Sequence, residues 1–81
     1  MKVRVRFFAE LRERTGCSEW NIDLPEKVSM QELWGHIRGQ FEALQSLGYR
    51  PLPVRNGAYT TWDQALEEGD ELAFLSPVGG G

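Results

Sequence analysis

The sequence predicts a single α+β domain in which one main helix packs across a mixed β-sheet, and a chain of 81 residues suffices for one such domain. Residues 2–9 and 19–24 alternate apolar and polar side chains, the pattern of half-buried strands. Residues 28–44 instead repeat apolar side chains every three and four positions, which indicates an amphipathic helix. A hairpin signal at Asn56-Gly57 and a strand-like stretch before the C-terminal glycines complete the pattern.

The first two strands are expected to pair as an antiparallel hairpin. In the first, Val3, Val5 and Phe7 share one face, whereas Lys2, Arg4, Arg6 and Phe8 share the other. Phe8 therefore interrupts a charged, outward series. Residues 10–14 are expected to form a short helical turn that closes at Gly16, where a positive φ is readily adopted. The second strand ends at Pro25, which lacks the N–H that a ladder requires.

The helix expected from Val28 to about Leu44 has a clear start. Ser29 and Glu32 have the spacing of a capping box, and Val28 and Leu33 have that of a hydrophobic staple. Its apolar stripe consists of Met30, Leu33, Ile37, Phe41 and Leu44. Gly35 also lies within this helix, where a glycine costs up to about 1 kcal/mol relative to alanine.

The second half of the chain adds a third strand that starts near Leu52, a return strand over residues 58–62, a single helical turn over residues 64–66 and a last strand. In the last strand Leu72 and Phe74 are expected to point inward, and Ala73 and Leu75 outward. This order of elements is that of the β-grasp, or ubiquitin-like, fold. The predicted organisation is a β-grasp domain over residues 1–75 and a flexible glycine tail over residues 76–81.

Composition excludes several classes of function. The net charge is −3, and no nucleic-acid-binding motif is present. No apolar run has membrane-spanning length and no signal peptide is evident, so we expect a cytoplasmic protein. The single cysteine, Cys17, excludes an intrachain disulfide and a cysteine-rich metal site. Cys17 and the lone His36 lie far apart in the sequence, and we interpret both as structural or incidental.

Two groups of charged residues have an ordinary and a functional interpretation. The acidic residues Glu67, Glu68, Asp70 and Glu71 do not have the spacing of a calcium loop, so we interpret them as a solvated turn rather than a cation site. Arg4 and Arg6 either keep the first strand soluble or form a docking patch for an acidic partner. No nucleotide-binding, hydrolase or zinc-protease motif is present.

The C-terminal Pro77-Val78-Gly79-Gly80-Gly81 offers the chemistry that other segments lack. A carboxylate at the end of an unbranched arm can be adenylated with ATP, and a sulfide equivalent then yields a thiocarboxylate. Six extended residues from Ser76 to Gly81 reach roughly 20 Å, far enough to enter another protein's active site. Glycine lets the arm pass where a side chain does not fit. We therefore expect Gly81 to carry a reactive group.

The sequence resembles the small subunits of molybdopterin synthase, the MoaD-type sulfur carriers. The resemblance lies in residues 5–13 with Gly16, in Arg55-Asn56-Gly57, and above all in residues 66–81, from Leu-Glu-Glu-Gly-Asp-Glu-Leu-Ala-Phe to the terminal glycines. Many members of that family have Ser, Thr or Ala where this chain has Gly79. This departure adds freedom to the tail and should not prevent activation.

The resemblance implies a pathway for the tail. A partner related to ubiquitin-activating enzymes uses ATP to adenylate Gly81, with Gly80 as the required neighbour, and a cysteine desulfurase or rhodanese-like protein donates the sulfur. The tail, including Pro77 and Val78, then inserts into the large synthase subunit. Two such carriers convert cyclic pyranopterin monophosphate into molybdopterin for the molybdenum cofactor.

The resemblance also implies partners and a division of labour. An exposed apolar patch matching Phe8, Tyr59 and Leu75 is expected to bind the large subunit and the activating enzyme. The catalytic groups are expected on the large subunit of a heterotetramer, so this chain is not an enzyme alone. It is expected to hold no cofactor and no metal, and to bind neither nucleic acid nor membrane.

Three alternatives remain open at this point. In the first, the chain carries sulfur for thiazole synthesis in the thiamine pathway. In the second, it is a ubiquitin-like modifier whose Gly81 forms isopeptide bonds with lysines. In the third, it is a ubiquitin-like interaction domain without such chemistry. Carriers for thiazole synthesis tend to be shorter, and Pro77-Val78 before the glycines argues against that alternative.

Overall fold

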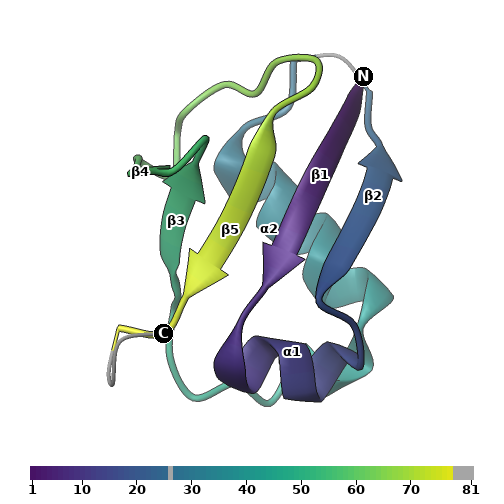
Figure 1. The fold of residues 1–81 in the computed structure, drawn as a ribbon, viewed down its shortest axis with the longest axis vertical. Helices are drawn as coiled ribbons and strands as arrows, with labels where there is room; N and C mark the ends of the chain where they lie inside the picture. The colour runs from purple at the N-terminus through teal and green to yellow at the C-terminus, as the bar shows by residue number, and fades with distance from the viewer. Residues whose placement is uncertain (26, 78–81) are drawn as a thin grey trace.

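The computed structural model describes residues 1–25 and 27–77, and these form a five-stranded sheet with one main helix across one face (Figure 1). In chain order the elements are β1 (Lys2–Phe7), α1 (Ala9–Thr15), β2 (Glu19–Asp23), α2 (Met30–Gln40), the 3-10 helix η1 (Glu42–Leu44), β3 (Leu52–Arg55), β4 (Ala58–Tyr59) and β5 (Glu71–Leu75). The predicted β-grasp fold is confirmed.

The sheet is mixed, with the strand order β2-β1-β5-β3-β4. β1 pairs with β2 antiparallel, as predicted, and with β5 parallel. β3 pairs with β5 and with β4 antiparallel. The first and last strands therefore lie side by side at the centre of the sheet, and β5 ends at the same end of the sheet as β1 (Figure 1).

The core lies between α2 and the sheet. From the sheet, Val3, Val5, Phe7, Leu72 and Phe74 are buried, and from α2 the buried residues are Met30, Leu33, Trp34 and Ile37. Inward and outward side chains alternate along β1 and β5 as the sequence predicted. The apolar face of the sheet is thus used by the core, and the opposite face remains available.

The N-terminus of α2 begins as predicted and is then held by a loop. Ser29 and Glu32 form the expected capping box. The backbone N–H of Met30 donates to the Gln64 carbonyl oxygen at 2.9 Å, and that of Gln31 donates to the Trp62 carbonyl oxygen at 2.9 Å. The loop after β4 therefore satisfies donors that a helix start leaves unpaired.

This loop corrects two predictions. The return strand expected over residues 58–62 stops at Tyr59. The helical turn expected over residues 64–66 is wrong, because Ala65 forms an isolated antiparallel bridge with Ser29 instead. The backbone N–H of Leu66 also donates to the Val28 carbonyl oxygen at 3.0 Å. Contacts with the start of α2 thus outweigh the local helical preference of this segment.

The helix expected to reach Leu44 is interrupted. α2 ends at Gln40, and Phe41 has an extended backbone with φ −116° and ψ 98° before η1 begins. The Phe41 ring packs edge-on against Phe7 and Trp20, with ring centroids 5.6 and 5.2 Å apart. The apolar stripe therefore still faces the core, but the helix ends before Phe41, whose ring packs at the end of the sheet.

The acidic turn before β5 is more than a solvated loop, and that interpretation is wrong for Asp70. Its side chain is buried, with 5% of the residue exposed. Asp70 Oδ2 accepts hydrogen bonds from Arg55 Nε and the Glu67 N–H, both at 2.8 Å, and Oδ1 accepts one from Asn56 Nδ2 at 3.0 Å. Asp70 thus joins the β3–β4 turn to the start of β5.

These contacts set the pKa of Asp70. Burial raises it, but hydrogen bonds from Arg55, the Glu67 backbone and Asn56 outweigh burial and hold the pKa below its ordinary value. The carboxylate is therefore ionised at neutral pH.

Among the described residues, no helix is long and apolar enough to cross a membrane.

Candidate functional site

The outer face of the sheet, opposite α2, carries a contiguous apolar surface at the end where β5 stops. We call this surface the docking face. It consists of Phe8, Leu52, Val54, Tyr59, Ala73 and Leu75. Strand register brings these residues together, because Leu52 pairs with Leu75, Val54 with Ala73, and Val54 also with Tyr59.

Exposure shows that the docking face is uncovered in the described part of the chain. Phe8 is 42% exposed, Leu52 39% and Tyr59 71%, whereas Leu75 is half-buried. Phe8 and Leu75 both line a shallow groove of about 310 Å³ that also includes Val54 and Ala73. An exposed apolar patch of this kind marks an interaction site on a soluble domain.

Sequence reasoning found Phe8, Tyr59 and Leu75 but missed half of this surface. The sequence predicts a third strand that starts near Leu52 but assigns no outward face to it, and it places Ala73 outward without a role. The signal was present, since Leu52 and Val54 alternate with Pro53, which is buried. Period two along β3 would have placed both residues outward.

A charged stripe borders the docking face along β1. Arg4 Nη1 and Arg6 Nε lie 3.6 and 3.4 Å from the same Glu71 carboxylate oxygen, and Arg4 Nε lies 3.7 Å from Glu19. Both arginines point outward, as predicted. Because these pairs are solvent-exposed, each adds little to stability. Their acidic neighbours already balance them, which favours the solubility interpretation over an acid-binding patch.

The tail begins at the edge of the docking face. β5 ends at Leu75, itself a docking-face residue, and Ser76 and Pro77 follow, with Pro77 exposed. The predicted site residues Val78, Gly79, Gly80 and Gly81 lie outside the described residues. The surface predicted to bind partners and the root of the arm predicted to carry the reactive group are therefore adjacent in the chain and in space.

The other candidates from the sequence are not brought together. Cys17 is half-buried and its sulfur contacts the Thr15 hydroxyl at 3.7 Å, whereas His36 is exposed on α2. Within residues 1–25 and 27–77, no cluster of three or more His, Cys, Asp or Glu side chains is arranged to hold a metal ion.

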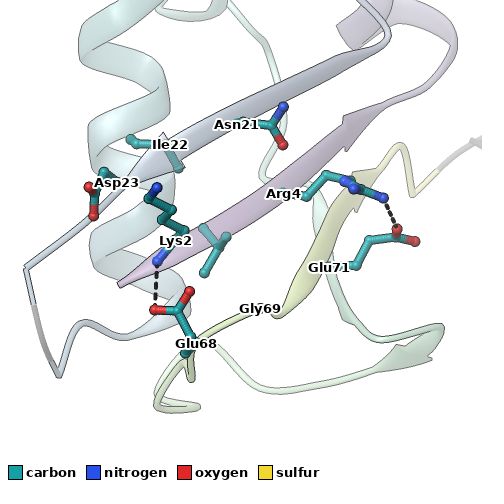
Figure 2. Close-up of a pocket in the computed structure, with 9 residues that line it drawn as sticks. Lys2, Arg4, Asn21, Ile22, Asp23, Glu68, Gly69 and Glu71 are labelled. Atoms are coloured by element: carbon teal, nitrogen blue, oxygen red, sulfur yellow. Dashed lines mark hydrogen bonds and ion pairs between the residues drawn. The ribbon is translucent and has the colours of Figure 1, made fainter.

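A polar hollow of about 510 Å³ lies at the opposite end of the sheet from the tail, where β1 and β5 start (Figure 2). In it the Lys2 backbone N–H donates to Glu68 Oε1 at 3.1 Å, and Arg4 pairs with Glu71. Two basic side chains, Lys2 and Arg4, face three acidic ones, Asp23, Glu68 and Glu71, so the charges along this hollow nearly balance. Its distance from the tail separates it from the predicted chemistry.

Comparison with known proteins adds to this geometry. The profile described as the ThiS family matches residues 5–81. The chain belongs to the ThiS family. It is 34% identical over 83 residues to the molybdopterin synthase sulfur carrier subunit of Escherichia coli, covering 98% of this chain and 99% of that protein. The family resemblance seen in the sequence is therefore confirmed.

Solved structures similar to this ThiS-family chain support the same fold. Small archaeal modifier protein 1 of Haloferax volcanii superposes with a TM-score of 0.85 at 26% identity, covering 95% of this chain and 98% of that one. A protein–protein complex of subunits 1 and 2 of the molybdopterin-converting factor of Helicobacter pylori contains a chain that superposes with a TM-score of 0.70 at 26% identity, covering 100% of both.

Proposed function

We propose that this chain is a sulfur carrier of the molybdopterin synthase small-subunit type, and that it acts in the cytoplasm. The observation that carries the proposal is the continuity of the docking face with the root of a Gly-Gly-Gly tail in a chain of this family. An apolar face binds the partner, and the arm that starts beside it enters the partner's active site.

The reactive group is the α-carboxylate of Gly81. A carboxylate resists nucleophiles because resonance and negative charge both disfavour attack. ATP converts it to an acyl-adenylate with release of pyrophosphate. A persulfide on the sulfur donor displaces AMP to form an acyl disulfide, and a thiol then cleaves that disulfide, which releases the thiocarboxylate and leaves the thiol and the donor sulfur joined as a disulfide. An activating enzyme of the ubiquitin-activating type and a sulfur donor such as a cysteine desulfurase or rhodanese-like protein supply these steps.

The thiocarboxylate sulfur is a soft nucleophile held at the end of the tail. In the large synthase subunit it attacks the carbon of cyclic pyranopterin monophosphate that is to receive sulfur, and an oxygen substituent leaves that carbon. Water then hydrolyses the resulting thioester, which leaves the sulfur on the pterin and returns Gly81 to the carboxylate. Holding the sulfur on a docked arm replaces a bimolecular encounter with an effectively intramolecular one. The acid–base groups belong to the large subunit, and this chain contributes docking, reach and the sulfur.

The partner follows from the docking face. The Helicobacter pylori complex pairs a similar chain with subunit 2 of its converting factor, and we extend that pairing to this chain. Phe8, Tyr59 and Leu75 make the apolar contact, and Pro77 and Val78 enter with the tail. The same face binds the activating enzyme at another time, so the two complexes exclude each other.

The test is adenylation by the cognate activating enzyme, measured as ATP–pyrophosphate exchange. The full chain is expected to support exchange, whereas a variant that lacks Gly81 is not, and the melting temperatures of the two proteins should agree. Absence of exchange with the full chain would contradict the proposal. A large loss of thermal stability on removal of Gly81 would instead mean that the tail has a structural role.

A protein modifier is the second candidate, because the Haloferax volcanii protein of similar fold is a small archaeal modifier protein. Both functions begin with adenylation of Gly81, so exchange does not separate them. Tryptic peptides from the native cells do. A modifier leaves lysines branched with the C-terminal residues of this chain, whereas a carrier leaves a thiocarboxylate.

A further inference from the structure

A groove of about 640 Å³ lies between α2 and the loop that leads from η1 to β3, and we call it the α2 groove. Helix α2 covers one face of the sheet, and the docking face is on the other (Figure 1). The residues that line the groove come from the helix and from the chain after it: Gln31, Trp34, Gly35, Arg38, Leu44, Leu47, Gly48, Tyr49 and Arg50. The groove is therefore a second surface, separate from the docking face.

Hydrogen bonds on both sides hold the chain that forms the loop rim of the groove. Gln45 Nε2 donates to the Arg38 carbonyl oxygen at 3.3 Å, which ties the loop to the end of α2. From helix α1, Arg14 Nη1 donates to the Ala43 carbonyl oxygen at 2.8 Å and to Ser46 Oγ at 2.9 Å. The groove is therefore preformed, and a ligand does not spend binding energy on ordering its walls.

The two arginines of the α2 groove have no acidic partner. The arginines that pair with a carboxylate all lie outside it, and they are Arg4, Arg6, Arg14 and Arg55. Arg38 and Arg50 form no ion pair with any described residue, and none of the described residues that line the groove is acidic. In a chain whose net charge is −3, this groove is a local exception. Its two uncompensated cations attract anions.

Arg50 is held in orientation by an aromatic column that reaches into the core. Its guanidinium carbon Cζ lies 4.2 Å from the centroid of the Trp62 ring. Trp62 in turn stacks on the buried Phe74, with ring centroids 5.8 Å apart and planes 22° apart. A guanidinium that lies on an aromatic face keeps the N–H donors along its edge free, and these match the two oxygens of a carboxylate. Arg50 therefore offers a pre-oriented site for a carboxylate.

The floor of the α2 groove offers a further donor. Trp34 has only 8% of its surface exposed, and its ring packs against Phe74 with centroids 4.9 Å apart. Its indole N–H makes no hydrogen bond to a described residue, although buried indoles usually find a partner. Among the described residues every side-chain nitrogen sealed from solvent has a partner, so this N–H is open to solvent. Since Trp34 lines the groove, the N–H is available to an acceptor there.

We propose that the α2 groove binds an acidic peptide segment of a protein partner. Carboxylates of the segment pair with Arg38 and Arg50, and an apolar side chain between them contacts Leu47 and the exposed edge of Trp34. The groove is open to solvent along one side, which suits an extended chain, whereas sites for small molecules enclose most of their ligand. Arginine clusters are a recurring means of binding acidic motifs. This site does not rest on the proposed function, and its place opposite the docking face allows both surfaces to be occupied at once.

The test is an NMR titration of the ¹⁵N-labelled full chain at low salt with the blocked peptide acetyl-Asp-Leu-Glu-Asp-amide. The indole N–H signals of Trp34 and Trp62 should shift together and saturate, with a Kd below about 1 mM. The signal of Trp20, which packs against Phe41 outside the groove, should stay in place. The matched peptide acetyl-Asn-Leu-Gln-Asn-amide has no carboxylates and should bind at least about tenfold more weakly, because hydrogen bonds to charged groups are the stronger ones.

Variants locate the binding site on the chain. Arg38→Gln and Arg50→Gln each remove one exposed cation from the groove and should each raise the Kd of the acidic peptide about three- to tenfold. Arg12→Gln makes the same change at an exposed arginine of α1 that also lacks an ion pair with a described residue, and it should change the Kd less than about twofold. Phe8→Ala alters the docking face and should likewise leave the Kd unchanged.

Three results would overturn the proposal. The first is no saturable shift of the Trp34 signal at peptide concentrations of several times about 1 mM. The second is an equal loss of affinity in Arg12→Gln and in the two groove variants, which would reveal general attraction to the charge of the chain. The third is a stronger response of the same signals to a thymidine decanucleotide than to the peptide, which would assign the groove to nucleic acid. None of these results bears on adenylation of Gly81, so the proposed function is tested separately.

Discussion

Replacing the buried Asp70 with asparagine should destabilise the domain strongly, although the two side chains have nearly the same shape. The carboxylate accepts three hydrogen bonds, from Arg55, Asn56 and the Glu67 backbone. An asparagine amide has one acceptor oxygen and presents an NH₂ group to at least one of these donors. Asn56 cannot simply rotate its amide, because its own oxygen accepts the Glu71 N–H at 2.9 Å.

The magnitude follows from the bonds lost. A hydrogen bond to a charged group contributes about 1.5–3 kcal/mol, and a neutral one about 0.5–1.5 kcal/mol. Asp70→Asn loses at least one charged bond and weakens the others. Since part of the site is open to water, we take about 2 kcal/mol as the loss in free energy of unfolding. For a domain of this size each kcal/mol lowers the melting temperature by about 4–8 °C, which predicts a fall of about 8–16 °C.

The assay is thermal and urea unfolding of wild type and Asp70→Asn as a function of pH. Since the folded pKa of Asp70 lies below its ordinary value of 3.8, the ionised carboxylate stabilises the fold above that pH. This contribution is lost as the pH falls through the folded pKa, so the difference between the two proteins should narrow in acid.

Asp63→Asn makes the same chemical change in a neighbouring exposed loop, where the carboxylate bonds only locally to Thr61, and it should alter stability by less than about 0.5 kcal/mol. The reasoning is refuted if Asp70→Asn melts within about 3 °C of wild type at neutral pH. It is also refuted if the difference between them is as large in strong acid as at pH 7.

Three further predictions concern two glycines and the docking face. Gly35→Ala should raise the free energy of unfolding, measured in urea, by about 0.5–1 kcal/mol, because this helical position is exposed and a new Cβ has no atom within 4 Å. Any destabilisation would contradict this prediction. Gly57→Ala should lower the free energy of unfolding by about 1 kcal/mol, because Gly57 has φ +84° in the β3–β4 turn, even though a new Cβ there has no atom within 4 Å. Equal stability of the variant and wild type would show that the turn relaxes. Phe8→Asp should weaken binding of the large synthase subunit by about 2 kcal/mol, near 30-fold in Kd by calorimetry. It should not lower the melting temperature, because Phe8 is 42% exposed and occupies the N-cap of α1, where aspartate is favoured; an unchanged Kd would remove Phe8 from the docking face.

The sequence was most informative where one physical preference acts alone. Alternation along β1 placed Phe8 outward, and the spacing of Ser29 and Glu32 located the start of α2. Asn56-Gly57 predicted a hairpin turn, and both residues have the positive φ that a type I′ turn requires. Each of these features depends on neighbours a few residues away, which is why a single sequence reveals it.

The sequence was least informative where distant segments meet. Asp70 looked like one acid among several in a turn, and only folding brings Arg55 and Asn56 around its carboxylate. Tyr49 donates a hydrogen bond to Glu10, far away in the chain, so no local pattern in the sequence predicted this contact. Ala65 pairs with Ser29 for the same reason. The pattern of apolar residues was enough to predict the core, but the polar contacts between distant segments could be seen only in the structure.

The central claim is that Gly81 carries sulfur, and the most direct test is the intact mass of the protein purified from its own cells. The account predicts a population whose C-terminal peptide ends at Gly81 and is heavier by the replacement of one oxygen with sulfur. That extra mass should disappear on incubation with the large synthase subunit and cyclic pyranopterin monophosphate. A chain that continues beyond Gly81, or that occurs only as the free acid even when its activating enzyme and sulfur donor are present, would contradict the account.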